Sequence, residues 1–263
     1  MRLVAPLVLL LATACAAPEA QRSRSDVLGA RRDLARALVA RGDLDAALEL
    51  IQPILAEHPD DAEALALRGI VHRERGLLAE AEADLREALR RDERLALAHS
   101  ALGIVRDLQG DPAGAETEHR RALSLEPRSP RYLNNLAFSL FAHGRAREAI
   151  PLYVEALRAD PTSTRLRNNL GYAYAATGDW PRARRQFEAA GSPPEARLHL
   201  GYAYERTGQL ALALAQYREA EQLSPRWPAA RDAAARVAGK LAKPQPLQEP
   251  DRPGAASPEG GAP

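Results

Sequence analysis

The sequence predicts an all-α solenoid built from six helix-turn-helix repeats, with a capping helix at the C-terminal end. Hydrophobic residues make up 46% of the chain and aromatic residues 5%, and most of the hydrophobic residues are alanine and leucine, which favours helices over strands. Five glycines, from Gly42 to Gly178, recur every 34 residues, and Gly208 follows after 30. The triplet Asn-Asn-Leu recurs at the same phase, at 134–136 and 168–170. A fixed period of this length is typical of stacked helical hairpins.

Each repeat is expected to contain two helices of about a dozen residues. The recurring glycine should end the first helix, because a helix often stops at a residue with positive φ. In the second helix a small residue follows the glycine at a fixed offset, and a larger residue comes one helical turn later. These pairs are Ala47 and Ile51, Ala81 and Leu85, Ala115 and His119, Ala149 and Tyr153, Ala183 and Phe187, and Ala213 and Tyr217.

The predicted boundaries follow from these positions. The six repeats cover 28–61, 62–95, 96–129, 130–163, 164–193 and 194–225. Asp111-Pro112, Ser129-Pro130 and Ser192-Pro193 each place an N-cap before a proline in the first helical position. Residues 226–241 fit one further amphipathic helix that would cover the last repeat. Residues 242–263 are rich in proline and glycine without an apolar period, so we expect them to be disordered.

The repeat resembles that of the tetratricopeptide repeat (TPR) family, a 34-residue helix-turn-helix with small, aromatic and proline residues at these positions. The resemblance covers residues 28–225. It implies a right-handed superhelix in which the first helices of successive repeats line a concave groove, where extended or helical segments bind. We therefore expect a protein or peptide partner, with no cofactor, metal ion or small-molecule substrate.

Carried over by repeat phase, the resemblance also implies which side chains face the groove. One position, just after the small residue of each first helix, is held by Arg36, Ile70, Ile104, Phe138, Tyr172 and Tyr202. In repeats 4 to 6, asparagine amides could pair with a peptide backbone while aromatic rings supply contact area. Alternatively, the asparagines bond to neighbouring helices and the rings pack between repeats. The candidate partner-binding residues are Arg131, Asn134, Asn135, Phe138, Phe141, Arg165, Asn168, Asn169, Tyr172, Glu195, His199 and Tyr202.

Repeats 1 to 3 fit the family pattern less well. Arg31, Arg68, His72, Arg106 and His119 stand where large apolar residues are usual in the family. The candidate groove therefore lies in the C-terminal half of the array.

Catalytic and metal-binding sites find little support in the sequence. His99 and His119 lie in one repeat, and Glu116 precedes His119 by three residues, which puts both on one helix face. No further histidine or cysteine accompanies them at ligand spacing, and no nucleophile motif or phosphate-binding loop is present. We expect structural histidines and a protein that is not an enzyme.

The charge balance argues against nucleic acid as a partner. The chain has 36 basic and 35 acidic residues, and removal of residues 1–14 takes away Arg2 and balances the two. Arg131, Asn135, Arg165 and Asn169 resemble the carboxylate clamp of TPR proteins that grip chaperone C-termini. The lysines of that clamp are missing here.

The N-terminus has the pattern of an export signal. Residues 3–14 are apolar, too short to span a bilayer, and end in small residues, so residues 1–14 are predicted to be a signal peptide. Cys15 is the one cysteine of the sequence, and an unpaired thiol is a liability in an oxidising compartment. Ala-Thr-Ala-Cys resembles a lipobox, which implies lipidation of Cys15 and a tether over 15–27. Ala16 implies sorting to the outer membrane, facing the periplasm, and ordinary cleavage to a soluble periplasmic protein is the alternative.

Together these features predict a non-catalytic binding scaffold of the bacterial cell envelope. The combination of signal, cysteine and six repeats resembles pilotin-like lipoproteins of type IV pilus secretins and the Tad/Flp pilus assembly lipoproteins. The expected partner is an envelope protein, either a secretin or a pilus component. An adaptor for peptidoglycan hydrolases or synthases, which are cell-wall enzymes, is the alternative.

Overall fold

The computed structural model describes residues 26–242, and within that range every regular element is an α-helix. The predicted signal peptide, Cys15 and nearly all of the tether lie outside the described residues, as does the predicted disordered tail from residue 243 onward. The predicted all-α fold is confirmed.

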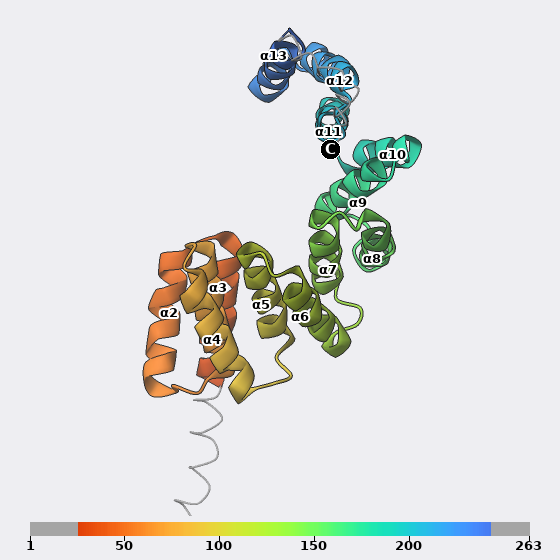
Figure 1. The fold of residues 1–263 in the computed structure, drawn as a ribbon. Helices are drawn as coiled ribbons and strands as arrows, with labels where there is room; N and C mark the ends of the chain where they lie inside the picture. The colour runs from red at the N-terminus through yellow and green to blue at the C-terminus, as the bar shows by residue number, and fades with distance from the viewer. Residues whose placement is uncertain (1–25, 243–263) are drawn as a thin grey trace, which may run out of the picture. The chain divides into compact units, whose positions relative to one another are not determined.

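The helices follow one another as hairpins joined by short turns (Figure 1). The first helix covers residues 26–41. It is followed by α2 (Leu44–Glu57), α3 (Ala62–Glu74), α4 (Leu78–Arg91), α5 (Ala96–Gln109), α6 (Pro112–Leu125), α7 (Pro130–Ala142), α8 (Ala146–Ala159), α9 (Thr164–Ala176), α10 (Trp180–Ala190), α11 (Pro193–Arg206), α12 (Leu210–Leu223) and α13 (Pro228–Ala242).

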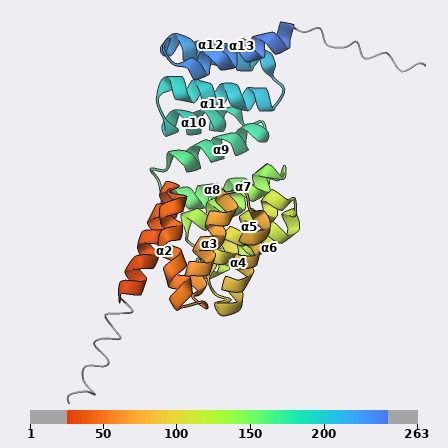
Figure 2. The ribbon, with the colours of Figure 1, turned by 90° about the vertical axis from the view of Figure 1, so that its left-hand side faces the viewer.

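The chain forms two compact units, Met1–Asp179 and Trp180–Pro263. In the first unit, α3, α5, α7 and α9 contact one another in sequence, so the first helices of successive hairpins lie side by side. In the second unit α11 packs on α10 and α12, and α13 packs on α12 (Figure 2). The boundary divides the predicted fifth repeat, because α9 belongs to one unit and α10 to the other.

The recurring glycines end the first helices as predicted. Gly42, Gly76, Gly110, Gly144, Gly178 and Gly208 all have positive φ, between 77° and 83°. Side chains other than that of glycine rarely adopt this conformation, which explains why the residue recurs at these turns.

The second-helix pairs found in the sequence form the centre of each hairpin. The six alanines are 0% exposed, and the six larger residues are at most 1% exposed. Small first-helix residues make room for them. A Cβ built on Gly103 would lie 2.7 Å from the His119 ring, and one on Gly201 would lie 2.5 Å from Cε1 of Tyr217. Each glycine therefore sets the distance between the two helices of its hairpin.

Ion pairs replace apolar packing in the second hairpin. Arg68 on α3 donates to Asp84 on α4 through Nε at 2.8 Å and Nη2 at 2.5 Å, and His72 Nδ1 lies 3.0 Å from the same carboxylate. Asp84 is 8% exposed, and its hydrogen bonds raise the pKa of Arg68. The departures from the family pattern at Arg68 and His72 are thus compensated by one buried carboxylate.

The third hairpin repeats this arrangement 34 residues later. Glu118, at the position of Asp84, lies 2.7 Å from His99 Nδ1 and 3.3 Å from Arg106 Nη1. Burial raises the pKa of Glu118, but its hydrogen bond with His99 and the charge of Arg106 outweigh burial and lower it overall. The polar residues therefore belong to the packing of the hairpin.

Another carboxylate links the third hairpin to the fourth. Asp107 on α5 lies 3.1 Å from His119 Nε2 in its own hairpin and accepts a hydrogen bond of 2.8 Å from Ser139 Oγ on α7. His119 and Ser139 are 1% and 3% exposed. These bonds fix α7 against the preceding hairpin, and they position the residues of α7 that follow.

The capping helix, α13, is held by a carboxylate of the last hairpin that has the same repeat position as Asp107. Glu205 on α11 accepts from Tyr217 at 3.0 Å, from Lys240 on α13 at 2.7 Å, and from Arg236 on α13. Burial opposes ionisation of Glu205, but hydrogen bonds from Arg236, Lys240 and Tyr217 lower its pKa to about 2. The helix was predicted over 226–241 and begins two residues later, at Pro228.

The interval from Gly178 to Gly208 is four residues shorter than the other glycine intervals, and α10 lies within it. This helix has 11 residues, whereas the second helices of the other hairpins have 14.

Candidate partner-binding groove

Two neighbouring first helices of the first unit, α5 and α7, each present an exposed apolar side chain. Phe138 on α7 is 53% exposed, and Leu108 on α5 is 58% exposed. Phe141 follows Phe138 by three residues, and Leu108 follows Ile104 by four, so each pair shares one helix face. Tyr172 on α9 is half-buried at the repeat position of Phe138. We call the surface formed by these residues of α5, α7 and α9 the groove.

The repeat position that Phe138 holds in α7 is not exposed in every hairpin. Ile70, at the same position in α3, is 4% exposed and belongs to the core. Arg36, one repeat earlier, pairs with Glu63 and lies 3.0 Å from Asp33. The open apolar surface therefore begins at α5 within the first unit.

The predicted asparagines join neighbouring hairpins. Asn135 Nδ2 donates to Ser100 Oγ at 2.9 Å, and Asn169 Nδ2 donates to Asn134 Oδ1 at 2.9 Å, both across 35 residues. Asn134 is 6% exposed, and its Nδ2 lies 3.4 Å from Asn135 Oδ1. Asn134, Asn135 and Asn169 therefore bond to neighbouring helices, which is one of the two alternatives that the sequence left open. Asn168 is half-buried on the same helix as Asn169.

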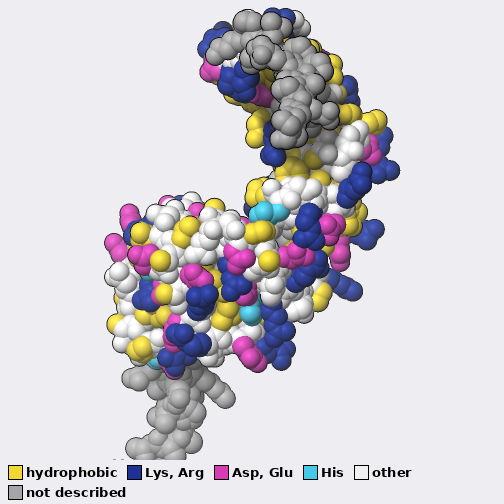
Figure 3. Space-filling view, in the orientation of Figure 1, with side chains coloured by type: hydrophobic (Ala, Val, Ile, Leu, Met, Phe, Trp, Pro, Cys, Tyr) yellow, Lys and Arg dark blue, Asp and Glu magenta, His cyan; other side chains and the backbone are white. Residues whose placement is uncertain are grey.

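Two exposed arginines stand beside the groove. Arg131 and Arg165 are the second residues of α7 and α9. The Arg131 guanidinium lies 5.8 Å from the centroid of the Tyr132 ring. Within residues 26–242 neither arginine has a carboxylate partner. Figure 3 shows charged side chains of both signs over α2 to α6.

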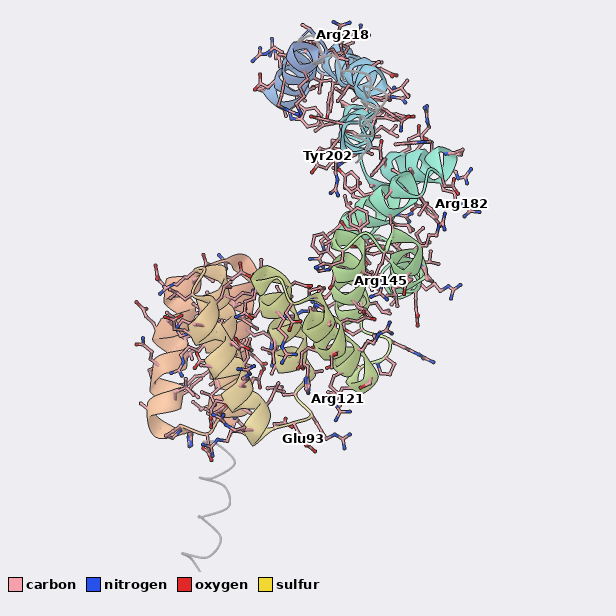
Figure 4. The ribbon with its side chains drawn as sticks, in the orientation of Figure 1. Glu93, Arg121, Arg145, Arg182, Tyr202 and Arg218 are labelled. Atoms are coloured by element: carbon pink, nitrogen blue, oxygen red, sulfur yellow. The ribbon has the colours of Figure 1, made fainter. Side chains whose placement is uncertain are left out.

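The last three predicted residues lie in the second unit, so we describe them separately from the groove. Glu195 accepts from the Ser192 backbone and Oγ at 2.7 Å, which caps α11 and lowers the pKa of Glu195. His199 stacks on Phe187 with ring centroids 5.7 Å apart, and burial lowers its pKa. Tyr202, labelled on α11 in Figure 4, is 45% exposed. Tyr202 and Glu195 are exposed, and His199 is half-buried.

Leu108 is a groove residue that the sequence interpretation missed. The signal was available, because Leu108 lies one helical turn beyond Ile104 on the same face.

The histidines considered for metal binding have other contacts. His119 is next to Asp107, while Glu116 pairs with Arg120 and with Arg145, which Figure 4 labels before α8. Within residues 26–242 no group of three His, Cys, Asp or Glu side chains is placed to hold a metal ion.

Successive helical hairpins whose first helices lie side by side in the first unit define a repeat protein of the class that binds other proteins. A tetratricopeptide repeat model matches residues 32–96, 100–164 and 168–228, and a second one matches 140–193. The chain belongs to the tetratricopeptide repeat family. TPR proteins are generally scaffolds for protein-protein interaction, and this chain is such a scaffold.

Several solved structures have the same fold. PilF of Pseudomonas aeruginosa is 18% identical with a TM-score of 0.62, and the match covers 81% of this chain and 99% of PilF. PilW, a type IV pilus biogenesis factor, is 16% identical with a TM-score of 0.64, over 78% of this chain and 97% of PilW. YrrB, a TPR protein with an unusual peptide-binding site, is 21% identical with a TM-score of 0.53, over 70% of this chain and 97% of YrrB. Among curated proteins none matches this chain.

Proposed function

We propose that this chain is a non-catalytic scaffold of the bacterial cell envelope that assists assembly of a pilus or secretin-type surface machine. It does so by holding a segment of an envelope protein in the groove of α5, α7 and α9. The observation that carries the proposal is the exposure of Phe138 and Leu108 on first helices of successive hairpins. Large apolar side chains exposed on neighbouring helices are typical of interaction sites.

The pilus assignment is supported by the fold of PilF and PilW. The matches cover almost the whole length of both proteins, 99% of PilF and 97% of PilW. PilW is described as a type IV pilus biogenesis factor. A scaffold of this length that binds a secretin or a pilus subunit fits that description.

We further propose that Cys15 is lipidated and anchors the chain to the outer membrane, facing the periplasm. The support is the apolar stretch before Cys15 and the small residues that end it. Among residues 26–242, no helix has the length and apolar character needed to cross a bilayer.

Affinity purification from the membrane fraction of the native host tests the proposal. A secretin or pilus subunit should be recovered with the chain, and mature chain should carry an acyl mass on Cys15. Recovery should fall about tenfold with Phe138→Ala and Leu108→Ala together, because each removes an exposed contact without opening the core.

The matched control is Leu223→Ala on α12, which is 51% exposed and lies outside the groove. It should leave recovery unchanged. Recovery of cell-wall hydrolases or synthases in place of pilus components would contradict the assignment. Equal recovery with the groove and control variants would contradict the groove.

A further inference from the structure

We infer that the chain forms a dimer through its N-terminal helix, residues 26–41, which pairs in parallel with the same helix of a second copy. The contact is a stripe of exposed apolar side chains that we call the seam, formed by Val27, Ala30, Leu34 and Ala37. Val27 and Leu34 are 50% and 53% exposed. The helix contributes no residue to the groove, so this inference goes beyond the proposed function and does not depend on it.

The seam occupies repeat positions that are buried in later hairpins of the first unit. The residues at the positions of Leu34 and Ala37 in α5, α7 and α9 are at most 3% exposed, and they are Leu102, Val105, Leu136, Ser139, Leu170 and Ala173. Each of these three helices packs on the second helix of the preceding hairpin, α4, α6 or α8. Among the described residues no hairpin precedes residue 26. The face that receives a helix elsewhere is therefore open at the N-terminal helix.

A helix fits the seam better than a lipid surface or an extended peptide does. The seam residues are spaced three and four apart, which is the pattern of the two apolar positions of a coiled coil over two heptads. Ala30 and Ala37 allow two helix backbones to approach closely. A membrane-binding helix, by contrast, requires a wide free apolar face, and this helix uses Ala35, Leu38 and Val39 to pack on its own core.

The charges beside the seam select a second copy as the partner. Asp26 and Arg31 flank the seam on opposite sides, both are exposed, and neither has an ion-pair partner among residues 26–242. In a parallel pair, Asp26 of each copy faces Arg31 of the other, so two ion pairs form across the seam. In an antiparallel pair aligned on the same apolar residues, the two Arg31 side chains face each other and repel. The next position of the stripe, Arg41, lies 3.2 Å from Asp43 of its own chain, so the seam ends at Ala37.

The sequence before the helix agrees with a parallel pair. Residues 16–25 contain no large apolar side chain to cover the seam. Parallel helices also begin at the same end, so the two chains leave the seam on one side. The anchoring proposed for Cys15 is compatible with this arrangement, because Asp26 follows Cys15 by eleven residues, which span up to about 36–40 Å.

Disulfide trapping with the purified full chain tests this inference. In a Cys15→Ser background, Leu34→Cys provides the one thiol of the chain. A parallel pair brings the two thiols opposite each other, at a distance that a disulfide bridges. Under mild oxidation, disulfide-linked dimer should form at least about tenfold faster than with Leu223→Cys on α12, because pairing raises the effective concentration of the thiols. Leu223 is the matched control, since it is 51% exposed.

Exchange of the flanking charges tests the choice of partner. Arg31→Glu should slow the cross-linking of Leu34→Cys about threefold, because it places two pairs of carboxylates across the seam. Asp26→Lys added to Arg31→Glu recreates two ion pairs with the charges reversed, and the rate should return to within about twofold of the original. Asp26 and Arg31 are both exposed, so neither change opens the core.

Equal rates for Leu34→Cys and Leu223→Cys would overturn the inference. Cross-linking that requires a mixture of Ala30→Cys and Leu34→Cys chains would overturn the parallel arrangement, since these positions face each other in an antiparallel pair. A rate that Arg31→Glu leaves unchanged would overturn the selection of a second copy by charge. None of these results bears on the groove, which the recovery of an envelope partner tests separately.

Discussion

Gly201→Ala should destabilise the second unit by about 2 kcal/mol, because the added methyl group overlaps a buried ring. Its Cβ would lie 2.5 Å from Cε1, 2.6 Å from Cδ1 and 3.1 Å from Cγ of Tyr217. The ring is 1% exposed, and its hydroxyl is bonded to Glu205, so it cannot retreat without breaking the bond next to α13. Urea unfolding followed by circular dichroism measures the loss.

Gly239→Ala is the matched control for this substitution. Gly239 lies inside α13, and a Cβ there would meet nothing within 4 Å. The better helix propensity of alanine should stabilise this variant by about 0.5–1 kcal/mol. Equal unfolding midpoints for the two variants would show that Gly201 does not set the helix distance.

Asp84→Ala should destabilise the first unit by about 2–3 kcal/mol, because it leaves two basic groups facing each other without their shared carboxylate. Arg68 and His72 both point to Asp84, and their side chains are 34% and 22% exposed. Thermal unfolding with the same optical signal measures the effect. Asp45→Ala is the control, since Asp45 pairs with Arg75 while 93% exposed, and its loss should cost less than about 0.5 kcal/mol.

Apolar substitutions at all three positions test why Asp84→Ala should lower the stability of the first unit. Arg68→Leu, His72→Tyr and Asp84→Leu together place apolar residues at these positions. Their combined stability should come within about 1 kcal/mol of the natural chain, since packing can replace a buried ion pair. A triple variant as unstable as Asp84→Ala would mean that the ion pairs contribute more than packing can.

The hairpins could be predicted because their turns make a strict demand on the backbone. A positive φ after each first helix requires glycine, so the 34-residue spacing appears in the sequence itself. The buried alanine and large residue of each second helix follow at fixed offsets because each hairpin packs its two helices together in the same way. The 30-residue interval from Gly178 to Gly208 contains the boundary between the two units, at Asp179 and Trp180.

The polar residues were harder to predict, because each depends on a neighbour from another helix. Arg68 and Arg106 departed from the family pattern, and their carboxylates, Asp84 and Glu118, lie on the following helix. These acids are 34 residues apart, so the repeat held the signal. For Asn134, the sequence left a peptide contact and a contact between hairpins equally open, and a 35-residue hydrogen bond to Asn169 shows the second.

We propose that α5, α7 and α9 form the surface that holds a partner. Hydrogen–deuterium exchange of the full chain, with and without the purified partner, tests it most directly. The account predicts slower exchange in these three helices and unchanged exchange in α6 and α8. Slowing confined to α6 and α8, or no change in α5, α7 and α9 at saturating ligand, would contradict it.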